Sequence, residues 1–210
     1  SVKAEMDLPG YRPEKSYTAD ETAINETIKL IKRAQRPLIL AGQGCMISRA
    51  HEELLEFAET LDCPVTTTLL GKGIIPETHP LAQGMLGMHG TAYANKAVCE
   101  CDLLINIGSR FDDRIIGQAD KFCADADIVH TDIDPSEMNK MIAPNVQVIC
   151  DAKTALNALL EKIEPAKHPK WNGKLDSYKK KFPLAYKKQG GLKMQQVIDE
   201  FNKQTNGEAI

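Results

Sequence analysis

The feature that most constrains the fold of this chain is a regular alternation of short apolar segments with amphipathic ones. Segments that are apolar throughout are typical of strands buried on both faces of a sheet, and the segments between them show helical spacing of apolar residues. The predicted strands are residues 37–41, 64–69, 102–108, 127–132 and 145–150, and the predicted helices are residues 20–31, 48–61, 90–101 and 151–163. Because such strands are joined by right-handed crossovers, we predict an α/β fold: a doubly wound, mainly parallel, six-stranded Rossmann-like sheet with helices on both faces.

Three parts of the chain differ in character. We expect residues 1–19 to be a linker from a preceding domain, 20–165 to be a nucleotide-binding central domain, and 166–210 to be a lysine-rich connector and the start of a next domain. The chain starts without an initiator methionine, and its last residues resemble the beginning of another apolar element. We therefore expect the sequence to be part of a longer polypeptide.

Composition narrows the class of protein further. The 210 residues are 42% hydrophobic and 26% charged, with a formal net charge of −3, which is typical of a globular protein. No apolar run approaches the roughly 18 residues of a membrane span, and the N-terminus lacks the apolar core of a signal peptide. The six cysteines are scattered without a CxxC pair, so we predict no metal site and a cytoplasmic protein without a membrane partner.

The segment 167–193 concentrates positive charge. It holds nine lysines and one aspartate, a net charge of +8 against −11 for the rest of the chain, with Trp171, Tyr178, Phe182 and Tyr186 interleaved. Lysines with aromatics would suit nucleic acid, but we favour a solvated connector whose aromatics pack on a neighbouring domain. We therefore expect no nucleic-acid partner. A short amphipathic helix is predicted after Gly190-Gly191.

Glycine clusters follow the first two predicted strands. Ligands of doubly wound sheets bind beyond the C-terminal ends of the strands, which is where these clusters fall. Gly42-Gln43-Gly44 resembles part of a dinucleotide fingerprint, but Ile47 stands where the third glycine belongs. Gly71-Lys72-Gly73 fits either a phosphate contact or a plain turn.

A denser cluster spans residues 84–91. Its glycines permit close backbone approach, and the helix that follows directs free N–H groups at the crevice, which would suit a pyrophosphate. Taken alone, His89 is more typical of a hydrogen-bonded structural histidine and Met88 of a core residue.

Charged residues follow the later strands. Arg110, in the run Gly108–Arg114, could bind phosphate oxygens through both nitrogens of its guanidinium group. The two arginines and two carboxylates of this run would equally suit a structural ion-pair cluster. Asp132 lies where ribose hydroxyls are usually accepted, and Asp151 is either a helix cap or an adenine-side contact. The sequence has no pattern of a catalytic nucleophile, so the domain is predicted to hold a long nucleotide and not to break bonds.

Three motifs together resemble one family. Leu86–Thr91, Gly108–Arg114 and Asp132–Pro135 occur in the order and spacing of the central domain of acetolactate synthase (acetohydroxyacid synthase) catalytic subunits, a family of thiamine-diphosphate enzymes. The resemblance implies that this domain binds FAD for structural reasons. It also implies a parent transferase that decarboxylates pyruvate and joins the two-carbon unit to pyruvate or 2-oxobutanoate in branched-chain amino-acid biosynthesis.

The resemblance also assigns residues. It places Met88, Asp113 and Arg114 near the substrate channel and inhibitor site. The cofactor-binding positions that it implies are Gly42, Gly44, Leu69, Leu86, Gly87, Met88, His89, Gly90, Gly108, Arg110, Asp112, Arg114, Asp132, Ile133 and Asp151.

The parent's catalytic groups are expected elsewhere. In the family, the thiamine-binding glutamate and the Gly-Asp-Gly motif that binds Mg²⁺ belong to flanking domains, which would be this domain's partners. We therefore expect no catalytic residue in this chain and no carboligase activity from it alone. The resemblance implies a homodimeric or homotetrameric parent, with a small regulatory subunit in some members. Two alternatives remain: the central domain of another thiamine-diphosphate enzyme holding ADP, CoA or nothing, and a stand-alone nucleotide-binding module.

Overall fold

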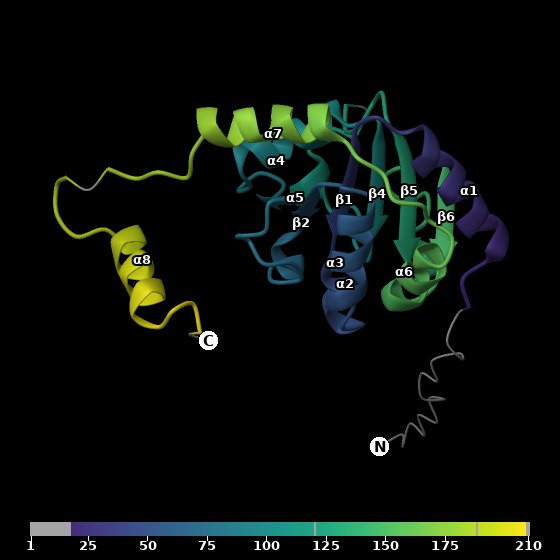
Figure 1. Cartoon of the computed structure of the whole chain (residues 1–210), viewed down its shortest axis with the longest axis horizontal. Helices are drawn as coiled ribbons and strands as arrows, with labels where there is room; N and C mark the ends of the chain where they lie inside the picture. The colour runs from purple at the N-terminus through teal and green to yellow at the C-terminus, as the bar shows by residue number, and fades with distance from the viewer. Residues whose placement is uncertain (1–17, 120, 188, 209–210) are drawn as a thin grey trace, which may run out of the picture.

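The computed structural model describes residues 18–119, 121–187 and 189–208, which form a six-stranded parallel sheet flanked by helices (Figure 1). The strands are β1 (Pro37–Ala41), β2 (Val65–Thr67), β3 (Ala82–Met85), β4 (Leu103–Ile107), β5 (Asp127–Asp132) and β6 (Val146–Ile149). Their order across the sheet is β3-β2-β1-β4-β5-β6, and every neighbouring pair is parallel. The predicted fold class is confirmed. Most of the predicted linker 1–19 lies outside the described residues.

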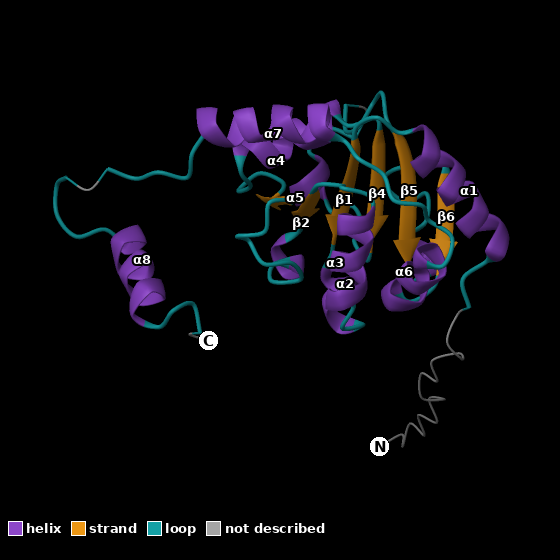
Figure 2. Ribbon diagram, in the orientation of Figure 1, coloured by secondary structure: helices purple, strands orange, loops and turns teal. Residues whose placement is uncertain are grey.

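Helices cover both faces of this sheet (Figure 2). They are α1 (Glu21–Arg33), α2 (Gln43–Ile47), α3 (His51–Thr60), α4 (Ala92–Glu100), α5 (Asp113–Ile116), α6 (Ala152–Leu160), α7 (Pro169–Lys181) and α8 (Met194–Gln204), with the 3₁₀ turns η1 (Leu69–Gly71) and η2 (Pro135–Glu137). Successive strand residues point to opposite faces. Ile39 therefore packs in the core beneath α1, α3 and α6, whereas Leu38 packs in the core beneath α4 and α7.

Strand order creates a crevice between β1 and β4. From β1 the chain proceeds outward through β2 and β3, and it then crosses to β4 and proceeds the other way through β5 and β6. The connections after β1 and β4 consequently leave in opposite directions, which opens a space at their C-terminal ends. Ala41 and Ile107 are paired at this edge.

Helix starts follow the capping residues of the sequence. The side chains of Asp20, Thr91 and Asp151 accept hydrogen bonds from backbone N–H groups in the first turns of α1, α4 and α6. The second predicted helix, residues 48–61, begins later in the structure than expected. Ser48 ends α2, and α3 begins after Ala50, because Arg49 adopts a positive φ of 54° that breaks the helix.

The predicted set lacks β3, α7 and the short helices α2 and α5. None of the predicted strands corresponds to β3, an edge strand whose Gly84 has a φ of 71° and whose pairing with β2 is irregular. The longest unpredicted element is α7, in the lysine-rich segment. Trp171 in α7 is only 2% exposed and its Nε1–H donates to the Pro37 carbonyl at 2.9 Å.

The prediction that the aromatics of this segment pack on a neighbouring domain is therefore wrong for Trp171. Leu175 is buried beside it, and the Tyr178 hydroxyl donates to Glu100 of α4 at 2.8 Å. These three side chains have helical spacing and form one face of α7, which the surrounding lysines obscure in the sequence. The amphipathic α8 is present as predicted, with its apolar residues exposed. Among the described residues, no helix has the length and apolarity to cross a membrane.

Candidate functional site

A cavity of about 570 Å³ lies at the C-terminal edge of the sheet, in the crevice between β1 and β4. Cavities of this size are typical of cofactor sites. Its lining consists of Gln43, Gly44, Ile47, Thr68, Leu69, Leu70, Gly108, Ser109, Arg110, Asp112, Arg114, Ile115, Thr131, Asp132, Ile133, Asp134, Glu137, Cys150, Asp151 and Ala152. The structure thus brings together Gly44, Leu69, Gly108, Arg110, Asp112, Arg114, Asp132, Ile133 and Asp151 from the predicted set.

The glycines after β1 and β4 pack against each other. The Gly42 N–H donates to the Ile107 carbonyl at 2.9 Å, and the Gly44 N–H donates to the Gly108 carbonyl at 3.0 Å. A Cβ on Gly44 would lie 2.7 Å from the Gly108 Cα, which is closer than such atoms approach in proteins. Gly44 and Gly108 line the cavity, whereas Gly42 lies behind them in the contact between the two loops.

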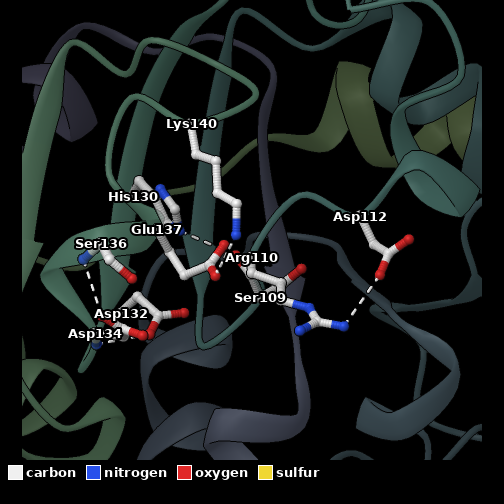
Figure 3. A network of polar contacts seen from close by, with 9 residues as sticks. All are labelled: Ser109, Arg110, Asp112, His130, Asp132, Asp134, Ser136, Glu137 and Lys140. Carbon is white, nitrogen blue, oxygen red and sulfur yellow. Dashed lines mark hydrogen bonds and ion pairs between the residues drawn. The ribbon is translucent and has the colours of Figure 1, made fainter.

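The loop after β4 supplies positive charge to the cavity. Arg110 leaves this loop with its side chain 67% exposed and pairs with Asp112 at 3.3 Å (Figure 3). Arg114 follows in α5, and its Nε lies 4.0 Å from Asp113. These ion pairs are long and solvated, so they contribute little to stability and leave the guanidinium groups free to bind an anion.

The ends of β5 and β6 supply acceptors. Asp132 accepts the Asp134 N–H at 2.9 Å, and Asp134 in turn accepts the Ser136 N–H at 2.9 Å (Figure 3). The hydrogen bond from the Ser136 backbone is the main cause that lowers the pKa of Asp134. Asp151 lines the cavity and also caps α6, with its Oδ1 accepting the Lys153 and Thr154 N–H groups. Its capping role, one of the two predicted alternatives, is thus confirmed.

The predicted loop 86–90 lies beside the cavity and not in its lining. The Met88 N–H donates to the Arg114 carbonyl at 3.1 Å, so the loop borders the Arg114 end of the site. Leu86 is buried in the core beneath α4, whereas Met88 and His89 are exposed and Gly87 and Gly90 complete the turn. Asp113 is exposed and likewise lies outside the lining.

Other residues differ from the sequence interpretation. Lys72, a candidate phosphate ligand, pairs with Glu77 at 2.6 Å and does not line the cavity. Thr68, Leu70, Glu137 and Cys150 do line it but carry no motif. Only their positions just after β2, in η2 and at the end of β6 could have indicated that they line the cavity. Among the described residues, no group of three or more histidine, cysteine or acidic side chains is arranged to hold a metal ion.

The charges of the cavity are separated. Arg110 and Arg114 come from the β4 side together with one carboxylate, Asp112, and the other acidic residues of the lining come from the β5 and β6 side: Asp132, Asp134, Glu137 and Asp151. Guanidinium groups bind phosphate oxygens, and carboxylates at strand ends accept ribose hydroxyls. The cavity therefore suits a ligand with phosphate next to nucleoside.

His130 lies directly behind this site, and its titration should make the stability of the fold depend on pH. It is fully buried on β5, and its Nε2–H donates to the Ser109 carbonyl at 3.0 Å. Burial lowers its pKa, and nearby Asp132 and Glu137 oppose that effect only in part. Burial also lowers the pKa of His168.

Since the unfolded chain takes up these protons from about pH 6.5 and the folded chain only at lower pH, the free energy of unfolding should fall as pH drops below about 6.5. One proton contributes at most about 1.4 kcal/mol per pH unit. Urea unfolding at pH 7.5 and 5.5 would measure the loss, which should be smaller in His130→Gln. An equal loss in that variant would contradict the role of His130.

The fold and the crevice define a doubly wound α/β class of domain with a cavity at the C-terminal edge of its sheet. Residues 24–159 match the family described as thiamine pyrophosphate enzyme, central domain, and the chain belongs to this family.

Relatives in this family carry one enzyme name. The chain is 43% identical to the acetolactate synthase large subunit of Corynebacterium glutamicum over 212 aligned positions, covering 98% of this chain and 34% of the relative. It is 42% identical to chloroplastic acetolactate synthase 1 of Zea mays, with 98% and 33% covered. It is 50% identical to a probable acetolactate synthase large subunit of Methanocaldococcus jannaschii over 159 positions, 76% of this chain and 27% of the relative. The chain thus spans about a third of the length of these relatives.

Proposed function

We propose that this chain is the central domain of an acetolactate synthase large subunit and that its cavity binds FAD. The observation that carries the proposal is the separation of charge across one cavity at the sheet's switch point, with both arginines and Asp112 on one side and four carboxylates on the other. A dinucleotide has this pattern, because its diphosphate is anionic and its adenosine carries ribose hydroxyls. The volume of about 570 Å³ and the donor set fit such a group.

The proposal assigns a role to each wall. Arg110 and Arg114 would bind the diphosphate and flavin-side groups, and Asp132 would accept ribose hydroxyls. Ile133 and Asp151 would contact the adenosine, with Leu69 beside the phosphate-ribose portion. The loop 86–90, in which Met88 and His89 are exposed, would border the flavin side near Arg114, because the Met88 N–H is already bonded to the Arg114 carbonyl.

The proposal extends to the parent enzyme. Its activity would be decarboxylation of pyruvate and condensation of the two-carbon unit with pyruvate or 2-oxobutanoate. Thiamine diphosphate and Mg²⁺ would bind to flanking domains, so this chain would provide no catalytic residue. FAD would be structural, since carboligation involves no net redox change. Met88, Asp113 and Arg114 are exposed at one end of the site, as a channel shared with a flanking domain requires.

Titration with FAD tests the proposal. A ligand that binds only the folded state raises the free energy of unfolding by RT ln(1 + [L]/Kd), about 2.7 kcal/mol at a hundredfold excess over Kd. We expect this gain with FAD, measured by thermal unfolding and by the change in flavin fluorescence. FMN, which lacks the adenosine, should give a smaller gain. Equal gains with ADP and FAD would instead favour a nucleotide site without a flavin portion, and no gain with FAD would contradict the proposal.

A further inference from the structure

Two buried polar side chains converge on one backbone atom behind the cavity. The Ser109 carbonyl oxygen accepts a hydrogen bond from His130 Nε2 at 3.0 Å and a second one from Asn106 Nδ2. Asn106 and His130 are fully buried and are paired in register on the adjacent strands β4 and β5. Figure 3 marks the hydrogen bond between His130 and Ser109, next to Arg110.

These two side chains make no other hydrogen bond in the part of the chain that the structure describes. Within the described part of the chain, the second polar atom of each, His130 Nδ1 and Asn106 Oδ1, is buried without a hydrogen-bond partner. Leaving a buried polar atom unpaired costs about 1–3 kcal/mol, so apolar residues would serve the core better at both positions. The feature that an apolar pair would lose is the double hydrogen bond to the Ser109 carbonyl.

The loop that contains Ser109 needs such an anchor. Gly108 has a φ of 65° and Phe111 a φ of 54°, a conformation that costs a non-glycine residue on the order of 1–3 kcal/mol. The Phe111 ring is buried and stands edge-on to His130, with centroids 4.8 Å apart and an interplanar angle of 64°. The same histidine therefore contacts the loop at two points, one on each side of Arg110.

We infer that Asn106 and His130 are positioning residues that fix the Gly108–Arg114 loop, so that Arg110 and Asp112 project into the cavity. This inference rests on the proposed function for its ligand, whereas the order of the loop is measurable without one. Neither side chain lines the cavity. Their effect on binding is exerted through the Ser109 carbonyl.

Variants of His130 that differ in whether the side chain can donate a hydrogen bond to the Ser109 carbonyl test this inference. A glutamine amide nitrogen occupies about the position of Nε2, whereas the shorter asparagine places its amide near Nδ1, too far from Ser109. His130→Gln should therefore retain the anchor, and His130→Asn and His130→Leu should lose it. Thr27→Val is the matched control, because it removes another buried hydrogen bond to a carbonyl, from Thr27 Oγ1 to Ala23 at 2.8 Å in α1, away from the cavity.

The first measurement uses the chain without ligand. Amide hydrogen exchange across residues 108–114, and tryptic cleavage after the exposed Arg110 and Arg114, report the order of the loop. We expect both rates to rise about tenfold in His130→Leu and His130→Asn, as loss of about 1.4 kcal/mol predicts. Rates close to wild type are expected in His130→Gln and Thr27→Val.

The second measurement is the Kd for FAD, which should rise about tenfold in the same two variants and recover in His130→Gln. Unchanged loop exchange in His130→Asn, or an equal rise in exchange in Thr27→Val, would overturn the inference. If His130→Leu does not fold, the Gln and Asn pair decides. Failure of the wild-type chain to bind FAD would overturn the proposed function alone, because the exchange measurement is independent of the ligand.

Discussion

Replacing Arg110 by alanine is expected to weaken FAD binding by about 10- to 100-fold. Hydrogen bonds to a charged group contribute about 1.5–3 kcal/mol, and Arg110 is one of two arginines in the cavity lining. Its side chain is 67% exposed and its ion pair with Asp112 is long at 3.3 Å, so its removal should cost little stability. Isothermal titration or flavin fluorescence gives the Kd, and thermal unfolding without ligand gives the stability.

Lys72→Ala is the matched control for this prediction. Lys72 is also a cation near a glycine-rich turn after a strand, but it pairs with Glu77 and lies outside the cavity lining. Its removal should change the Kd less than twofold. A larger effect from Lys72 than from Arg110 would show that the phosphate site has been assigned to the wrong loop.

Replacing Gly42 by alanine is expected to lower the free energy of unfolding by about 3 kcal/mol and to abolish FAD binding. An added Cβ would overlap the Gly108 carbonyl oxygen and lie 2.6 Å from both the Gly108 carbonyl carbon and the Ser109 Cβ. Two of these atoms are backbone, which moves only if both loops shift, and overpacking of this kind typically costs 1–3 kcal/mol or more. The shift would displace Gly108 and Ser109, which line the cavity.

Gly173→Ala provides the opposite expectation. Gly173 lies inside α7, and a Cβ there would meet nothing within 4 Å. Alanine should therefore raise the free energy of unfolding by about 0.5–1 kcal/mol, because glycine is a poor helix former. Urea denaturation of both variants, followed by circular dichroism, gives the comparison. Destabilisation of similar size in both would contradict the steric argument for Gly42.

The site could be predicted from the sequence only in part. The arginines, Asp132 and Asp151 were identified because each follows an apolar strand, and parallel strands end at one edge of a sheet. Lys72 matched the same pattern but points toward Glu77, and Leu86, which only the family resemblance assigned, points into the core. A position after a strand fixes the edge of the sheet and does not fix the direction of the side chain.

Residues that belong to no motif could not be assigned to the cavity or to the core from the sequence. Glu137 and Cys150 line the cavity through the path of the chain after β5 and β6. Trp171 joins the core through a hydrogen bond to Pro37, 134 positions away. In the sequence, its lysine neighbours hide the apolar face of α7.

The sequence by itself determined the class of fold, the starts of α1, α4 and α6, and the edge of the sheet at which a ligand would bind. These follow from local periodicity and capping chemistry, which act over a few residues. Only the tertiary structure decided that Gly42 packs on the β4 loop and that Asn106 and His130 hold the Ser109 carbonyl. Both contacts depend on the order in which β1, β4 and β5 lie side by side, because strand order brings together residues that are far apart in the chain.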